Sequence, residues 1–257
     1  MNHDYISPQI AVYKNSKNLV EFRDKLKVAS LECYAHIHAD GEATEDSWKR
    51  TSLIGILMKD YSAGTGDKAI TVMANISPDE SKFVLSRLNA GFPTFEFKQD
   101  KIFGTPDANG YSSVTKLRLQ RAATDKAGKP RNCPWYMEIE NGKGIPQRNS
   151  NGGTYMKPNS YISEKKVSAN LTDLDLFKLL NRVSSYIDAW EKAIAPSLIT
   201  RAKKPFRKIR QKGKGRQISL PHSLYPLFKK ENALNTHSLF YTRKGSNTHE
   251  NRNCKKN

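Results

Sequence analysis

Ser77-Pro-Asp-Glu80 has the pattern of a capping box at the start of a helix. The Ser77 hydroxyl can accept a hydrogen bond from the Glu80 amide, and the Glu80 carboxylate can accept one from the Ser77 amide. Pro78 falls at the first helical position, where proline is favoured. The apolar residues that follow, and the glycine after them, predict a helix that ends at Gly91.

Four segments with β-strand character precede this helix, at residues 19–27, 28–38, 52–61 and 68–76. The second alternates most regularly, because apolar and polar residues take turns from Leu31 to His38. Turn-type residues separate the segments at 39–41 and 62–67. We therefore predict a ββββα unit over residues 19–91, preceded by an N-terminal extension of residues 1–18.

The same order of elements follows in the second part of the chain. Predicted strands at 94–103, 113–122, 134–140 and 161–170 lead to Thr172-Asp-Leu-Asp175, which caps a longer helix. Apolar residues recur along this helix at spacings of four and three: Leu176, Leu180, Val183, Ile187, Trp190 and Ile194. This stripe favours packing on a sheet, with a coiled-coil dimer seam as the alternative. The sequence predicts a second ββββα unit over residues 92–200 with antiparallel strands.

Most of the positive charge lies at the C-terminal end. The chain carries a formal net charge of +18, and residues 201–257 hold 16 Lys and Arg against Glu231 and Glu250. We expect this tail to be disordered and to act as a phosphate-binding arm. A solvated solubility tail is the alternative. The candidate contacts in the arm are Lys203, Lys204, Arg207, Lys208 and Arg210.

The ββββα–ββββα order resembles that of Whirly proteins, of the paired PUR repeats and, at half size, of PC4-like coactivators. The resemblance covers about residues 19–200 and rests on the order of elements. It implies an α+β fold and binding of single-stranded nucleic acid on the sheets. The Lys-Gly-Lys-Ala-Ala-Leu run typical of plant Whirly proteins is absent; Lys143-Gly144 is only a fragment of it. No site residue of those families therefore transfers to this chain.

Composition supports a polyanionic partner. A protein with a sequence pI of about 9.7 attracts polyanions at neutral pH. Nucleic acid is the first candidate, followed by an anionic membrane or an acidic protein. No apolar run is long enough to cross a membrane, and the polar start predicts no signal peptide. Three widely spaced cysteines, Cys33, Cys133 and Cys254, indicate a reducing cytoplasm and exclude a CxxC-type zinc site.

We predict binding of single-stranded DNA, or RNA, with little sequence preference and no cofactor, and a homo-oligomer is plausible. Bases would stack on Tyr34 and Tyr136, and basic side chains on strand faces and strand ends would contact phosphates. The predicted binding residues of the body are Tyr34, His36, Lys98, Lys101, Lys116, Arg118, Arg121, Arg131, Tyr136 and Lys143.

Two alternatives stay open. His36-Ile-His38 would place two imidazoles on one strand face, where they could ligate a metal. This pattern resembles that of HUH endonucleases and relaxases. By this resemblance, Tyr186 would be the nucleophile of this chain. No third convincing metal ligand is visible in the sequence. The other alternative is a basic adaptor for an acidic protein. We predict a protein that is not an enzyme.

Overall fold

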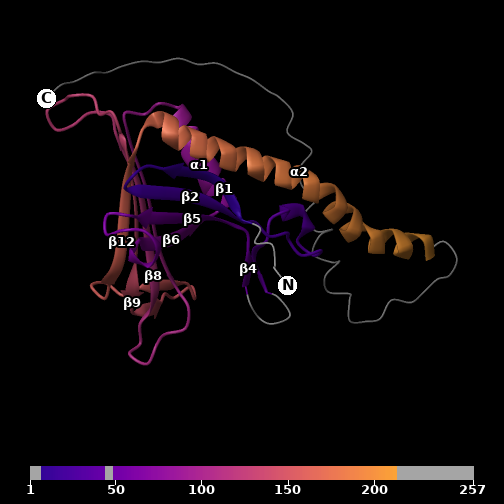
Figure 1. Cartoon of the computed structure of the whole chain (residues 1–257). Helices are drawn as coiled ribbons and strands as arrows, with labels where there is room; N and C mark the ends of the chain where they lie inside the picture. Colours follow the sequence, from indigo (N-terminus) through magenta and orange to yellow (C-terminus); the bar gives the residue numbers. More distant parts are fainter. Residues whose placement is uncertain (1–6, 44–48, 213–257) are drawn as a thin grey trace, which may run out of the picture. The chain divides into compact units, whose positions relative to one another are not determined.

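Two four-stranded antiparallel sheets form the body of the protein (Figure 1). The computed structural model describes residues 7–43 and 49–212. Sheet 1 has the order β1 (Gln9–Lys14), β2 (Asn18–Lys25), β5 (Leu53–Asp60) and β6 (Ile70–Ile76). Sheet 2 has the order β12 (Ile162–Leu171), β9 (Trp135–Gly144), β8 (Ser112–Ala122) and β7 (Thr94–Phe103).

A helix follows each sheet in the chain. Helix α1 (Pro78–Asn89) comes after sheet 1, and α2 (Asp173–Lys212) comes after sheet 2. Two small hairpins interrupt the sheets, one of β3 (Asp40–Ala43) and β4 (Lys49–Thr51), the other of β10 (Pro146–Arg148) and β11 (Thr154–Met156). The fold is thus α+β, with antiparallel sheets and two helices, as the sequence predicts.

Both predicted caps form. The Ser77 hydroxyl accepts from the Glu80 N–H at 3.0 Å, and the Glu80 carboxylate accepts from the Ser77 N–H at 2.6 Å. At the start of α2, the Thr172 hydroxyl accepts from the Asp175 N–H at 3.0 Å. Gly91 follows α1 with φ of +68°, a conformation that glycine adopts without strain.

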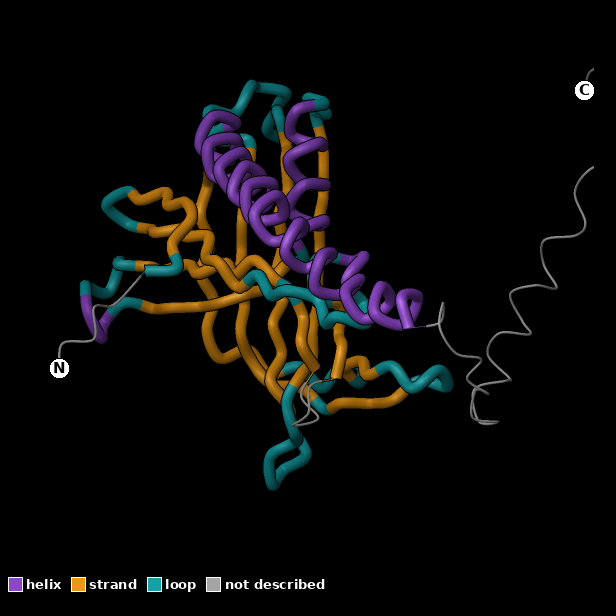
Figure 2. Tube along the Cα trace, turned by 90° about the vertical axis from the view of Figure 1, so that its right-hand side faces the viewer, coloured by secondary structure: helices purple, strands orange, loops and turns teal. Residues whose placement is uncertain are grey.

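One hydrophobic core joins both sheets, α1 and the part of α2 up to Ile187. Alternate residues of β2, β5 and β6 face it from sheet 1, and alternate residues of β8, β9 and β12 face it from sheet 2. The apolar stripe of α2 lies in this core from Leu176 to Ile187, so core packing is confirmed for that part of the stripe. In Figure 2, α2 lies diagonally across the strands.

The strand predicted at residues 28–38 is wrong. The segment is a loop with a short 3₁₀ helix at Tyr34–His36, and an isolated bridge between Val28 and His38 closes it. The Ser30 hydroxyl accepts from the Cys33 N–H at 3.2 Å, so a local side-chain contact wins over strand pairing. The fourth strand of sheet 1 is instead β1, which lies within the predicted N-terminal extension.

The predicted start of a disordered tail at residue 201 is also wrong, because α2 continues to Lys212. Leu198 and Ala202 of this part of the helix are buried. Lys, Arg, Gln and Ala favour helix, and extending an existing helix avoids the cost of nucleation. Residues 213–257 of the predicted tail lie outside the described residues. Within the described ranges, no helix is long and apolar enough to span a membrane.

Sheet 1 meets sheet 2 through its edge strand β6, which contacts β12, β9 and β8. Asn141 of β9 forms two hydrogen bonds with the backbone of Met73 on this edge. Its amide nitrogen donates to the Met73 carbonyl and its oxygen accepts from the Met73 N–H, both at 2.9 Å. The Asn141 side chain thus pairs with β6 as a neighbouring strand would.

We expect Asn141→Ala to lower the free energy of unfolding by about 1–2 kcal/mol, because both Met73 backbone groups lose their partner. Chemical denaturation followed by circular dichroism measures this. Asn170→Ala is the matched control, since Asn170 is an exposed strand residue on β12. Equal effects of the two substitutions would show that the Asn141 pairing does not stabilise the junction.

Candidate nucleic-acid interface

The outer face of sheet 2 has the side-chain arrangement that the sequence predicts. Leu117 and Leu119 are buried in the core, and Lys116 and Arg118 point to the opposite side. Tyr136 lies opposite Gln120 on the neighbouring strand and therefore shares the outer face. Lys98 of β7 joins them, because it lies opposite Arg118.

This outer face carries no excess of positive charge. Most basic residues on it have an acidic neighbour across the strands: Arg118 lies opposite Glu138, and Lys116 lies between Asp100 and Glu140. Lys98 lies opposite Arg118 and pairs with Glu96 on its own strand. By register, the basic members are Lys98, Lys116, Arg118 and Lys166, and the acidic members are Glu96, Asp100, Glu138 and Glu140. A balanced surface gives little long-range attraction for phosphates.

Several of these side chains are already engaged. Lys166 contacts the Glu138 carboxylate at 2.7 Å, and the Tyr136 hydroxyl donates to the same carboxylate. Although burial acts to raise it, the pKa of Glu138 lies below its usual value because of the hydrogen bonds from Lys166 and Tyr136. Lys116 lies over the Tyr161 ring at 3.5 Å. Stacking of a base on Tyr136 would compete with its bond to Glu138.

Arg121 and Arg131 hold the fold locally. The Arg121 guanidinium donates twice to Asp173 at 3.1 Å and also to the Phe92 carbonyl. The Arg131 side chain donates to the Thr124 carbonyl in the β8–β9 loop at 3.2 Å. Lys143 lies 3.4 Å from Glu164. None of these three joins the outer face in one continuous basic surface.

A different basic surface lies on the outer face of sheet 1. Arg23 and Lys25 are neighbours on this face of β2, and Lys14 and Lys59 lie further along it. Glu21 is the one acidic strand residue that the register puts on this face in the described chain, and it pairs with Arg23 at 2.7 Å. Gly55 of β5 lies opposite Arg23, and a Cβ there would come within 3.0 Å of the Lys25 side chain. The Lys25 stem therefore crosses the sheet over Gly55.

Two lysines from different sheets converge on Asn75 of β6. The Lys25 ammonium donates to the Asn75 side-chain oxygen at 2.9 Å, and the Lys101 ammonium donates to the Asn75 carbonyl at 3.0 Å. In the described part of the chain, neither lysine forms an ion pair with a carboxylate. We call Arg23, Lys25, Asn75 and Lys101 the junction cluster.

Both lysines of the junction cluster have pKa values below the ordinary lysine value. Burial, and then the charges of Arg23 and Lys27, lower the pKa of Lys25 from its ordinary value. Burial also lowers the pKa of Lys101, and the Glu80 carboxylate offsets this in part. Lowered lysine pKa values mean that the site disfavours its own positive charges, so an anion placed there would be stabilised.

One exposed aromatic residue, Phe103, lies beside the junction cluster. Asn75, Lys101, Phe103 and Thr154 are among the residues that line a pocket of about 360 Å³ where the two sheets meet. The Phe103 ring is 54% exposed, and Tyr155, which follows Thr154 on β11, is 42% exposed. β11 packs against β7. The junction thus combines cations with a ring on which a base could stack.

The sequence prediction included Lys101 but missed Arg23, Lys25, Asn75, Phe103 and Tyr155. One signal was present: Arg23, Lys25 and Lys27 follow one another with the period of two that puts side chains on one strand face. The convergence of Lys25 and Lys101 on Asn75 had no such signal, because it depends on how the two sheets meet.

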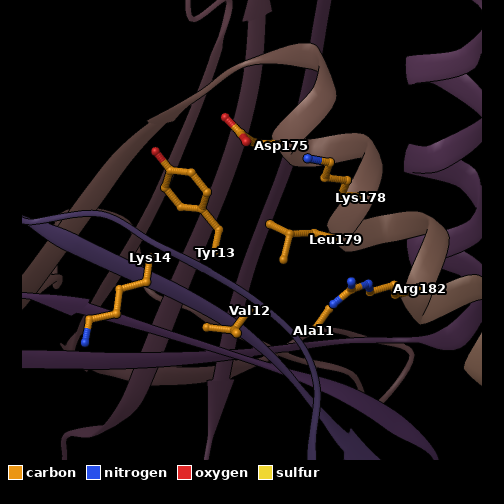
Figure 3. Close-up of a pocket in the computed structure, with 8 residues that line it drawn as sticks. All are labelled: Ala11, Val12, Tyr13, Lys14, Asp175, Lys178, Leu179 and Arg182. Carbon is orange, nitrogen blue, oxygen red and sulfur yellow. The ribbon is translucent and has the colours of Figure 1, made fainter.

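A second basic groove separates β1 from α2 (Figure 3). Lys178 and Arg182 of α2 line it opposite Ala11 and Val12, and its volume is about 330 Å³. Lys14 points away from the groove in Figure 3. Asp175 also lines the groove, and its carboxylate caps α2 through Thr172. Tyr13 also lines the groove.

His36 and His38 do not share a strand face, so the predicted metal-binding pair is wrong in geometry. Between them, Ile37 has φ of +62°, which turns the chain. The His38 ring stacks on Trp190 with centroids 4.8 Å apart and contacts Glu191 at 3.2 Å. Both histidines line an open pocket of about 590 Å³, but His38 belongs to no group of three metal-ligating side chains among the described residues.

The remaining predicted residues lie apart from the junction. Tyr34 is half-buried in the 3₁₀ helix. The Tyr186 hydroxyl donates to Asp24 at 2.8 Å, and burial with this bond raises its pKa to about 12. Lys203 and Lys204 are exposed on α2. Arg207, Lys208 and Arg210 belong to the same helix, and their side chains lie outside the described part of the structure.

No protein-family model, curated protein or solved structure matches the chain. Function is therefore inferred from the geometry of its own residues.

The contact of Arg121 and Trp135 with Asp173 predicts a pH-dependent stability. Hydrogen bonds from Arg121 and then Trp135 lower the pKa of Asp173 below the ordinary aspartate value of 3.8. The stabilisation is therefore complete above that value and is lost as pH falls through the lowered pKa. We expect Asp173→Asn to lower the unfolding free energy by about 1–2 kcal/mol at neutral pH, since the carboxylate is partly exposed.

Denaturant unfolding of wild type and Asp173→Asn between neutral and acidic pH measures this difference. The two proteins should converge in acid, because a protonated Asp173 resembles asparagine. Glu32→Gln, at an exposed loop position, is the control. A difference that stays constant with pH would contradict the assignment.

Proposed function

We propose that the protein binds single-stranded nucleic acid, DNA before RNA, at the junction where sheet 1 meets sheet 2. The observation that carries this proposal is the convergence of Lys25 and Lys101 on Asn75 without a carboxylate partner in the described chain. A phosphate would take the place of a carboxylate partner, and its negative charge would offset the burial that lowers the pKa of both lysines.

The charge distribution supports the junction over the outer face of sheet 2. Sheet 1 presents Lys14, Arg23, Lys25 and Lys59 with only Glu21 among them, whereas sheet 2 balances its outer charges. A phosphate chain would follow the outer face of sheet 1 and pass Lys101. The basic residues of α2, from Lys203 onward, would add sequence-independent affinity that salt weakens.

The exposed aromatic residue favours a single strand. Phe103 offers an exposed ring in the pocket beside Lys101, and an unpaired base can stack on it, whereas a base within a duplex cannot. No set of side chains at the junction forms a base-reading pattern along a helix, so we propose little sequence preference. The repeated ββββα order also agrees with a Whirly- or PUR-like arrangement, which is part of the same proposal.

Binding of a labelled single strand to the full chain, followed by fluorescence anisotropy over a salt series, tests the proposal. We expect Lys25→Gln with Lys101→Gln to weaken binding and to reduce the slope of log K against log salt by about 1.4, since two phosphate contacts are lost. Phe103→Ala should cost about 1–3 kcal/mol of single-strand affinity.

Lys98→Gln with Arg118→Gln is the matched control, because it removes the same charge from the balanced face. An equal loss of affinity in the two double variants would refute binding at the junction. It would show that affinity depends only on the total positive charge. Unchanged binding in both would assign the affinity to the basic residues beyond the junction. A labelled acidic peptide that displaces the strand, and that binds more tightly, would favour the adaptor alternative.

The lowered pKa values predict how binding responds to pH. Bound phosphate favours the ammonium forms, so affinity should fall as pH rises through the lowered pKa values, which lie below the ordinary lysine value of 10.5. Lys25→Arg with Lys101→Arg should keep its affinity to higher pH, because arginine stays charged. Identical pH profiles for the two proteins would argue against phosphate contacts from these lysines.

A further inference from the structure

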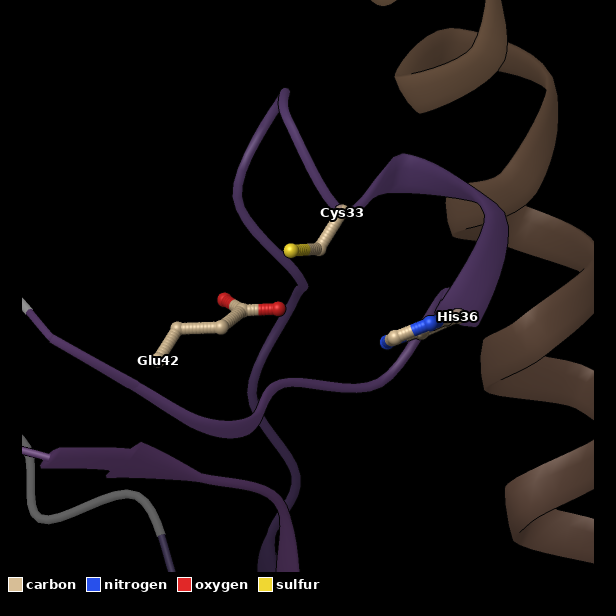
Figure 4. A group of neighbouring side chains, drawn as sticks. All are labelled: Cys33, His36 and Glu42. Carbon is tan, nitrogen blue, oxygen red and sulfur yellow. The ribbon is translucent and has the colours of Figure 1, made fainter. Parts of the chain in front are cut away.

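Three metal-ligating side chains meet in the loop that replaces the predicted second strand. The ligand atoms of Cys33, His36 and Glu42 all lie within 4.8 Å of one another (Figure 4). Figure 4 shows the Cys33 sulfur, the Glu42 carboxylate and the edge of the His36 ring around one space. In the described chain, this is the group of His, Cys, Asp and Glu residues close enough to share one ion.

Local structure explains how Cys33 and His36 come together. Cys33 precedes the 3₁₀ helix Tyr34–His36, and the His36 N–H donates to the Cys33 carbonyl at 3.0 Å. Side chains three residues apart in a 3₁₀ turn eclipse one another, so the Cys-x-x-His spacing puts both on one side. Ile37 then reverses the chain with φ of +62°, a strained value for a β-branched residue.

Glu42 supplies the independent observation. One carboxylate oxygen accepts from the Ser30 N–H at 2.8 Å, which fixes the orientation of the group. The other oxygen, Oε1, is buried and has no hydrogen-bond partner among the described residues. A buried oxygen without a partner costs about 1–3 kcal/mol, and native proteins rarely leave one unexplained. A cation between Cys33, His36 and Glu42 would satisfy it.

We propose that Cys33, His36 and Glu42 bind one divalent transition-metal ion of the zinc class. The donor set decides the class: a thiolate and an imidazole select zinc-like ions, whereas magnesium and calcium require oxygen ligands. Ligands around tetrahedral zinc lie roughly 3.5 Å apart, given metal–ligand distances of about 2.0–2.3 Å. Small side-chain rotations bring the three donors from within 4.8 Å to that spacing.

Three protein ligands leave a fourth coordination position. His36 is exposed, so this position faces solvent and takes a water molecule. On binding, the Cys33 thiol releases its proton to solvent and coordinates as the thiolate. The ion would fasten the 3₁₀ turn to β3. His38 takes no part, because it contacts Ser52 and Glu191.

Cobalt titration of the full, reduced, metal-free chain tests the site. Cobalt(II) replaces zinc, and its bond to a thiolate produces a strong absorption band that bonds to nitrogen and oxygen do not. We expect this band to rise to one equivalent in the wild type and to disappear when zinc is added. Cys33→Ser should lose the band, whereas Cys133→Ser, at an exposed loop position, should keep it.

His36→Ala and Glu42→Gln should weaken cobalt binding while leaving a thiolate band at high metal concentration. Retention of the full band in Cys33→Ser, or its absence in the wild type, would overturn the proposal. Alkylation of the unmutated chain gives a second readout that does not depend on any variant folding. Zinc should slow the reaction of Cys33 with iodoacetamide and leave Cys133 unaffected; equal rates with and without zinc would equally overturn the site.

Discussion

The open backbone edge of β6 is the constraint on which the arrangement of the two sheets depends. An edge strand presents N–H and C=O groups that need partners, and burying them without partners is costly. In this protein the partners are side chains of sheet 2: Asn141 pairs with Met73, and Lys101 caps the carbonyl of Asn75. The sheets therefore meet edge to face. The core forms on one side of this junction, and the basic cluster forms on the other.

The two ββββα units share their topology but differ in the chemistry of their outer faces. Sheet 2 carries equal numbers of cations and anions on its outer face, which gives little net field. Sheet 1 gathers cations around Gly55 and Asn75, where their mutual repulsion is tolerated. Burial lowers the pKa of Lys25 and Lys101 at the junction, whereas the balanced face of sheet 2 is typical of solvated sheet.

Much of the fold could be predicted from local patterns. Strand faces such as Leu117 and Leu119 against Lys116 and Arg118, and both helix caps, follow from period and spacing alone. The strand predicted at residues 28–38 was wrong although apolar and polar residues alternate regularly there. The hydrogen bond from the Cys33 N–H to the Ser30 hydroxyl favours a turn instead. The continuation of α2 was missed because charge density suggested disorder, although lysine and arginine favour helix.

The candidate sites were harder to predict than the fold, because they depend on contacts between distant segments. The bonds of Asn75 to Lys25 and Lys101 span both sheets, and no local pattern indicates them. Cys33, His36 and Glu42 are neighbours because residues 28–38 form a turn. The strand predicted there gave no indication of this cluster. His36 and His38 are two residues apart, which would put them on one face of a strand. The positive φ of Ile37 between them turns the chain, so their side chains do not share a face.

Gly55 shows what the basic junction costs the fold. Glycine in a buried central strand lacks a side chain to pack and loses about 0.5–1 kcal/mol of stability relative to alanine. A Cβ at this position would come against the Lys25 side chain at 3.0 Å and displace its ammonium group from Asn75. The open space that Gly55 leaves is thus used by the Lys25 side chain, which reaches Asn75 across it.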